Sequence, residues 1–98
     1  MSTELTFTTG RDPDGSLVVG AAGEIDMSNA SALSDALAEA RRREEAFVLD
    51  LTAVEYLDSA GLAVLFPHVG HVRLVAGPLL GPLLTIAGLA GVTTIRDA

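Results

Sequence analysis

Five consecutive residues in the middle of the chain restrict its fold more than any other feature. Phe47-Val48-Leu49-Asp50-Leu51 is apolar at four of five positions and rich in residues that favour β-structure. A strand with apolar side chains on both faces belongs in the interior of a sheet. The rest of the chain must therefore supply strands on both sides of it and helices that cover it.

Strand-like segments precede and follow this central strand. Glu4–Thr9 alternates apolar residues with threonines, which predicts a half-buried strand. Asp12-Pro13-Asp14-Gly15 has the composition of a turn, and Leu17–Asp26 predicts the strand that completes a β-hairpin. Two further strands are predicted over Val72–Ala76 and Val92–Ile95.

Three helices are predicted between these strands. The first covers Asn29–Glu45, preceded by Asp26 and Ser28 as candidate N-caps, and its apolar residues recur at helical spacing: Ala30, Leu33, Leu37 and Ala40. A second helix follows Asp58 and is stopped early by Pro67, and a third covers Pro78–Ala87. Alternating strands and helices predict an α/β fold, a mixed sheet covered by helices in one domain over residues 1–98.

The composition excludes several classes of function. The net charge of −7 and the absence of lysine argue against nucleic-acid binding, which needs clustered basic residues. The absence of cysteine excludes disulfides and thiolate metal sites. The first ten residues lack the pattern of a signal peptide, so we expect a cytoplasmic location.

The stretch from Leu74 to Ile95 holds 22 residues without a charge, which is long enough on paper to span a bilayer. Pro78 and Pro82 interrupt it, together with four glycines, and each proline inside a helix costs about 3 kcal/mol. The stretch is therefore predicted to fold as strand, short helix and strand, with no direct membrane insertion.

Candidate chemical groups are few. His68-Val69-Gly70-His71 places two histidines together but offers no third ligand, so no metal and no cofactor are expected. Asp58-Ser59-Ala60-Gly61 lacks the Gly-x-Ser-x-Gly pattern of a nucleophile elbow, and no glycine run has phosphate-binding spacing, so an enzyme is not expected. An aspartate and a serine before a helix can also serve only as N-caps.

Three segments in order carry a family resemblance: Gly23-Glu24-Ile25-Asp26, then Val48–Leu51 followed by Leu57-Asp58-Ser59-Ala60-Gly61-Leu62, and finally Pro78…Leu84…Gly88-Leu89. Over nearly the whole chain the sequence resembles a STAS domain of the anti-sigma factor antagonist type. The resemblance implies a mixed sheet of about four to five strands with helices mainly on one face.

The resemblance also implies a function. Antagonists of this family bind an anti-sigma factor that is a serine kinase, are phosphorylated by it and then dissociate, until a phosphatase restores them. The matching phosphoacceptor is Ser59, and the partner-binding residues implied here are Asp26, Asp58, Ser59, Gly61 and Leu62. The alternative within the family is an accessory subunit of a membrane transporter complex of the ABC type.

The third predicted helix raises a separate expectation. It carries Leu79, Leu80, Leu83, Leu84 and Ile86, with Thr85 as its only polar side chain. A helix that is apolar on all sides is normally buried on all sides. We therefore expect Leu79, Leu80, Leu83 and Leu84 to form an interface, either in a homodimer or with an obligate partner, unless neighbouring loops cover them.

Overall fold

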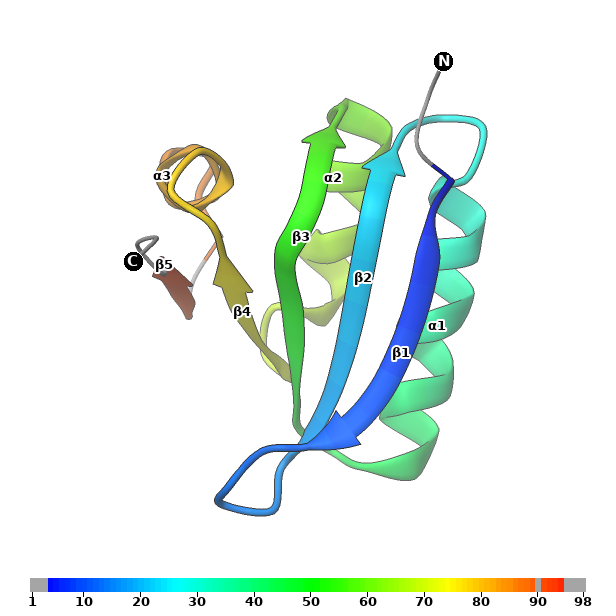
Figure 1. Cartoon of the computed structure of the whole chain (residues 1–98), viewed down its shortest axis with the longest axis vertical. Coiled ribbons are helices and arrows are strands. Elements are labelled where there is room, and N and C mark those ends of the chain that lie inside the picture. Colours follow the sequence, from blue (N-terminus) through cyan, green and yellow to red (C-terminus); the bar gives the residue numbers. More distant parts are fainter. Residues whose placement is uncertain (1–3, 90, 95–98) are drawn as a thin grey trace.

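The computed structural model describes residues 4–89 and 91–94. Its strands form one sheet in the order β1-β2-β3-β4-β5, with bounds Thr6–Arg11, Leu17–Ile25, Phe47–Leu57, Val72–Ala76 and Val92–Thr94. The β1–β2 hairpin is antiparallel, and all later pairs are parallel (Figure 1). The predicted mixed α/β sheet, with the Phe47 strand at its centre, is confirmed.

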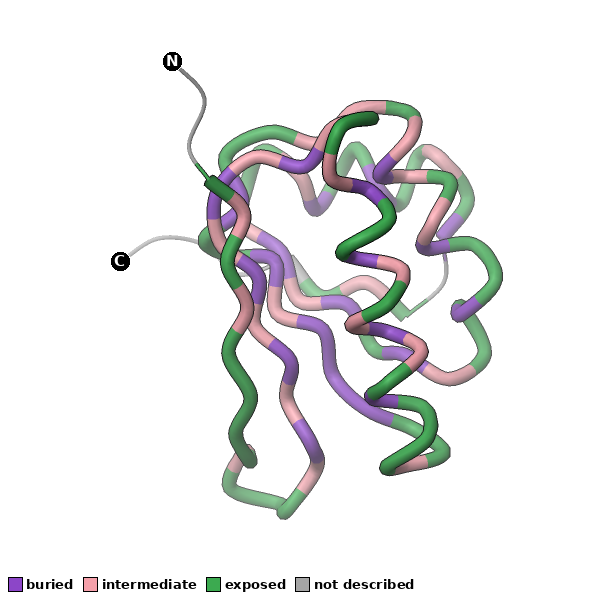
Figure 2. Tube along the Cα trace, turned by 90° about the vertical axis from the view of Figure 1, so that its right-hand side faces the viewer, coloured by how far each residue is buried: buried purple, intermediate pink, exposed green. Residues whose placement is uncertain are grey.

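The helices α1 (Ala30–Arg43) and α2 (Ser59–Leu65) lie side by side on one face of the sheet. Figure 2 shows the strands on one side of the molecule and these helices on the other. A short 3-10 turn, Phe66–His68, follows α2, and α3 (Leu80–Ile86) lies beside the end of β4. Both parallel crossovers between β2 and β4 therefore run over the same face.

The core lies between the sheet and these helices. Alternate residues of β2 are buried along its whole length because one face of the strand meets the helices. The fully buried large side chains are Leu17, Ile25, Leu33, Leu37, Leu49, Leu51, Leu65, Leu74 and Leu84. All four apolar positions predicted for the first helix are buried.

The strand β3 is the element that differs most from the prediction. It continues to Leu57, six residues beyond the apolar run, and stays paired with β2 as far as the Ile25–Leu57 pair. Between Gly20 and Glu24 the register shifts twice, so that β3 carries an extra residue at each shift. These bulges break the alternation by which a strand is recognised.

The remaining differences are at element ends. The helix α1 begins and ends within the predicted range, and α3 begins at Leu80, after Pro78. The predicted end of the last strand, Ile95, lies outside the described residues. No helix within residues 4–89 and 91–94 is both long and apolar enough to cross a membrane.

Candidate functional site

Asp58 joins three segments at the carboxyl ends of β2 and β3. Its Oδ1 accepts a hydrogen bond from the backbone N–H of Gly61 at 3.0 Å, which caps the start of α2. Its Oδ2 accepts from the N–H of Met27 at 3.2 Å, and its own N–H donates to the Ile25 carbonyl at 3.2 Å. Asp58 thus fixes the β3–α2 corner against the loop that follows β2.

Ser59 is the first residue of α2, and its side chain is exposed. Among the residues that the structure describes, none forms a hydrogen bond with its hydroxyl, whereas Asp58 makes the capping bond. Asp58 therefore caps α2, a role that the sequence allowed for either Asp58 or Ser59. The Ser59 hydroxyl is left facing solvent on a firmly positioned backbone.

The loop before α1 is closed by Asp26. Its Oδ1 accepts from the Ser28 N–H at 2.9 Å and from the Ser28 hydroxyl at 2.5 Å. These bonds favour the carboxylate and lower the pKa of Asp26 below its ordinary value. The loop places the half-buried Asp26 on the same edge of the sheet as Asp58.

The prediction that Asp26 or Ser28 caps α1 is wrong. The N-cap position is Asn29, and its side chain turns back into the loop instead of onto the helix. Its Oδ1 accepts from the Asp26 N–H at 2.9 Å and its Nδ2 donates to the Glu24 carbonyl at 2.8 Å. The Asp26 side chain is occupied by Ser28, so both residues shape the loop and leave the helix start to backbone groups.

Gly61 does not belong to the exposed surface, contrary to its predicted role in partner binding. It is buried where α2 meets the ends of β2 and β3. A Cβ at this position would lie 2.5 Å from Leu57 Cδ1 and 2.7 Å from Ile25 Cγ2. Gly61 therefore permits close packing, and Leu62 beside it is half-buried and packs against the core.

Two exposed side chains at this edge were missed by the sequence interpretation. Met27, 81% exposed, lies in the loop whose N–H binds Asp58, and Tyr56, 50% exposed, precedes the corner in β3. Tyr56 pairs with Glu24 of β2. An apolar residue inside the polar sequence Asp26–Asn29 was the available signal for Met27.

Among the described residues, the charged side chains at the carboxyl ends of β2 and β3 are all acidic, whereas the opposite end carries arginines together with acidic residues, including the ion pairs Arg11–Glu44 and Arg42–Glu39. Four acidic residues lie at the carboxyl ends of β2 and β3, around Ser59: Glu24, Asp26, Glu55 and Asp58. The five described arginines lie near the opposite end, at the end of β1, the end of α1 and the start of β4: Arg11, Arg41, Arg42, Arg43 and Arg73. Ser59 thus lies on an edge that already carries negative charge.

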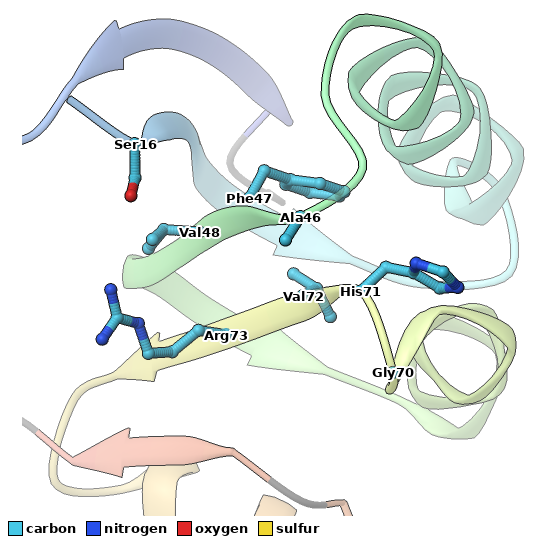
Figure 3. A pocket seen from close by; sticks show the side chains of 8 residues that line it. All are labelled: Ser16, Ala46, Phe47, Val48, Gly70, His71, Val72 and Arg73. Atoms are coloured by element: carbon cyan, nitrogen blue, oxygen red, sulfur yellow. The ribbon is translucent and has the colours of Figure 1, made fainter.

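The pocket in Figure 3 lies at that opposite end, at the amino ends of β3 and β4. It has a volume of about 300 Å³ and includes Ser16, His71 and Arg73, with the His71 ring pointing away from Arg73. His68 nearby is buried, and its Nδ1 lies 3.5 Å from Arg41 Nη1. In the part of the chain described here, no group of three or more His, Cys, Asp or Glu is arranged to hold a metal ion.

The residues of α3 and Leu79, which precedes its first residue, divide between two environments. Leu79 and Leu83 are 88% and 49% exposed, Leu80 is half-buried, and Ile86 is 84% exposed. Leu84 has no exposed surface, so its predicted place in an interface is wrong, because it is part of the chain's own core. The outward-facing part of the predicted interface is Leu79 and Leu83, with the edge of Leu80.

A mixed five-stranded sheet with two helices on one face, and a capped helix that presents a serine after the central strand, is the arrangement of a STAS-class domain. The family described as "Mlab, STAS domain" matches residues 9–94. The chain belongs to this family.

Several known proteins are similar to the chain. Anti-sigma-F factor antagonist RsfB of Mycobacterium tuberculosis is 44% identical over 55 residues, which cover 55% of this chain and 45% of that protein. The match therefore spans less than half the length of this curated relative. An anti-sigma factor antagonist from Mycobacterium paratuberculosis is 35% identical, with a TM-score of 0.75, over 88% of this chain and 80% of that one.

Two more distant structures share the fold. The unphosphorylated form of the anti-sigma factor antagonist SpoIIAA is 13% identical, with a TM-score of 0.68, over 95% of this chain and 89% of that one. A protein with a SpoIIAA-like fold from Shewanella loihica is 16% identical, with a TM-score of 0.66, over 99% and 88% of the two chains. The STAS fold predicted from the sequence is confirmed.

Proposed function

We propose that the chain is an anti-sigma factor antagonist that binds a serine-kinase anti-sigma factor while Ser59 is unmodified and releases it when Ser59 is phosphorylated. The observation that carries the proposal is the exposed Ser59 hydroxyl, held at a fixed corner by Asp58. The antagonists named among the similar proteins support the same class of partner.

The surroundings of Ser59 suit a charge switch. A phosphate adds about −1.5 to −2 charges at neutral pH. It would join Asp26 and Asp58 on an edge where no described arginine lies. A partner surface that fits the neutral hydroxyl then meets like-charge repulsion and an added cost of desolvation. A phosphatase that removes the group restores the binding form.

The decisive experiment is phosphorylation by the anti-sigma factor kinase that co-purifies with the tagged chain. After incubation with ATP, peptide mapping by mass spectrometry is expected to place the phosphate on Ser59 and nowhere else. Ser59→Ala should bind the kinase and remain unmodified, and Ser28→Ala is the matched control because Ser28 is also exposed on this edge. Modification of another residue with Ser59 untouched, or recovery of transporter subunits in place of a kinase, would contradict the proposal.

A further inference from the structure

Half of β3 lacks a neighbouring strand on one edge. Its pairing with β4 covers only Phe47–Asp50, whereas its pairing with β2 continues to Leu57. Figure 1 shows β3 and β4 diverging beyond this point. Apart from the extra residue that β3 carries at each bulge, alternate N–H and C=O groups of an edge strand point away from its only partner. The Thr52 N–H is already donated to Asp50 Oδ1 at 2.9 Å, so the available edge begins after Thr52.

A groove of about 230 Å³ runs between this edge and the start of α3. The β3 side consists of Thr52, Val54 and Glu55, and the opposite side includes Pro78, Leu79 and Leu80. The Leu79 side chain is 88% exposed, although it stands beside a backbone edge that can form hydrogen bonds. Pockets that enclose small molecules usually measure about 300–1,000 Å³, so the groove suits part of a chain better.

The charge of the groove specifies its occupant further. Glu55 is the one charged residue among those that line it. The Tyr56 beside it pairs with Glu24, and the described arginines lie at the other end of the strands. An occupant with basic side chains would therefore be attracted to this edge, and an acidic one repelled.

A second copy of the chain does not meet these requirements. Gly77 and Pro78 of the β4–α3 connection line the groove opposite β3, and its volume of about 230 Å³ leaves space for part of one chain. A second copy would also bring its own acidic edge against Glu55. A single extended segment, free on both sides, satisfies both the shape and the charge.

We propose that this groove binds an extended segment of a partner protein, which adds to the free edge of β3 as a further strand. Apolar side chains of the segment pack on Leu79 and Leu80, and a basic side chain faces Glu55. Main-chain hydrogen bonds along the edge supply affinity, and the alternating side chains supply specificity. This binding goes beyond the Ser59 switch and needs no phosphate.

The probe for this proposal is a capped seven-residue peptide of alternating lysine and valine, about 23 Å long when extended. In an NMR titration of the full chain, amide shifts are expected to centre on Ala53–Tyr56 and on Gly77, Leu79 and Leu80. A peptide of alternating glutamate and valine should bind at least about tenfold more weakly. So should the lysine–valine peptide N-methylated at alternate residues, because it cannot complete the ladder.

A matched pair of variants distinguishes binding in the groove from nonspecific binding to the protein surface. Leu79→Lys should weaken binding of the lysine–valine peptide at least about tenfold, whereas Ile86→Lys, on a side chain of similar exposure outside the groove, should change it less than about twofold. Glu55→Lys should reverse the preference between the two peptides. Equal effects of the two lysine variants, shifts centred elsewhere, or no shift at millimolar peptide would overturn the proposal, and the last result would mean that the β3 bulges only protect the edge.

Discussion

The hydrogen bonds of the Asp58 side chain join segments that are far apart in the sequence, since Met27 is 31 residues away from Asp58. The side chain does more than cap a helix, because the same carboxylate holds the loop after β2. Asp58 thus both caps α2 and fixes the loop after β2. Ser59 receives a fixed backbone from its neighbour while its own hydroxyl is not needed for the cap.

Asp58→Ala is expected to lower the free energy of unfolding by about 1–2 kcal/mol, because a capping bond is lost and the Met27 N–H loses its acceptor. Urea denaturation measures the change. Asp35→Ala, on an exposed α1 position, serves as the control and should stay within about 0.5 kcal/mol. Asp58→Asn should restore only part of the stability, since its single amide oxygen can accept from Gly61 while its Nδ2 cannot accept from the Met27 N–H. An Asp58→Ala protein as stable as the wild type would show that the corner does not depend on the carboxylate.

Ser59→Asp is expected to weaken binding of the anti-sigma factor at least about tenfold, or about 1.4 kcal/mol, without unfolding the domain. The added carboxylate stands beside Asp58 and Asp26, while the exposed position costs the fold little. Isothermal titration gives the affinity and circular dichroism the fold. Unchanged affinity would remove Ser59 from the interface, and Ser59→Ala should bind as the unmodified protein does.

His68 is expected to make the stability of the fold depend on pH. Burial, followed by the nearby Arg41 and His71, lowers the pKa of His68 below its ordinary value of 6.5. The unfolded chain then binds the proton more readily than the folded one, so stability is complete above about pH 6.5 and falls as the pH drops below it. The carboxyl groups whose pKa is lowered titrate at more acidic pH: Asp14, Asp26 and Glu44.

Urea midpoints at pH 7.5, 6.5 and 5.5 check this expectation. The wild type should lose stability over this range, and His68→Gln should lose distinctly less. An equal slope in the two proteins would assign the effect to other groups. The burial of His68 could not be predicted from the sequence, because it depends on α1 packing beside the turn.

At the scale of elements, α2 packs closely against the ends of β2 and β3 at Gly61. Gly61→Ala should destabilise the fold by about 1–3 kcal/mol, because the new methyl group would overlap Ile25 and Leu57. Ile25 is β-branched and fully buried and therefore yields little. Gly70→Ala is the control, since nothing lies within 4 Å of its added Cβ, and it should stay within about 0.5 kcal/mol. Thermal unfolding that is equal for both variants would contradict the packing.

The order of elements could be predicted from the sequence, whereas the length of β3 could not. The apolar run Phe47–Leu51 and the helical spacing of α1 are local patterns that burial preserves. After Leu51 the strand is hard to recognise, because the bulges turn successive residues to the same side. The exposed residues there are Thr52, Ala53, Glu55 and Tyr56. The free edge of β3 and its groove follow from that hidden extension, so neither was predicted.

At the scale of the whole molecule, the exposed part of α3 sets a limit on self-association. Its seven residues span about 10 Å, whereas a stable interface buries about 800 Å² on each partner. We therefore expect a monomer at micromolar concentration. We expect Leu79 and Leu83 to contact a partner protein instead of a second copy. Light scattering after size exclusion, over a hundredfold range of concentration, checks this. A stable dimer that Leu83→Glu disrupts would instead assign the surface to a second copy.

The distribution of charge in the folded chain differs from its distribution along the sequence. Along the chain, twelve of the thirteen acidic residues lie at or before Asp58. In the folded chain, β2 and β3 bring acidic residues together at their carboxyl ends, while α1 returns its arginines to the other end, where Arg11–Glu44 and Arg42–Glu39 form ion pairs. This arrangement of acidic residues and arginines depends on the topology of the sheet, which brings distant segments together.

This separation of charge has a consequence for the speed of recognition. A molecule that is negative at one end and bears its arginines at the other turns in the field of a cationic partner before the two surfaces touch. The groove beside Glu55, at the negative end, would then face a basic segment of the partner in a larger share of encounters. The association rate constant should accordingly fall as ionic strength rises and the Debye length shortens from about 30 Å at 0.01 M to about 10 Å at 0.1 M. The acidic end of the sheet would thus help set how soon the partner is found, as well as how firmly it is held.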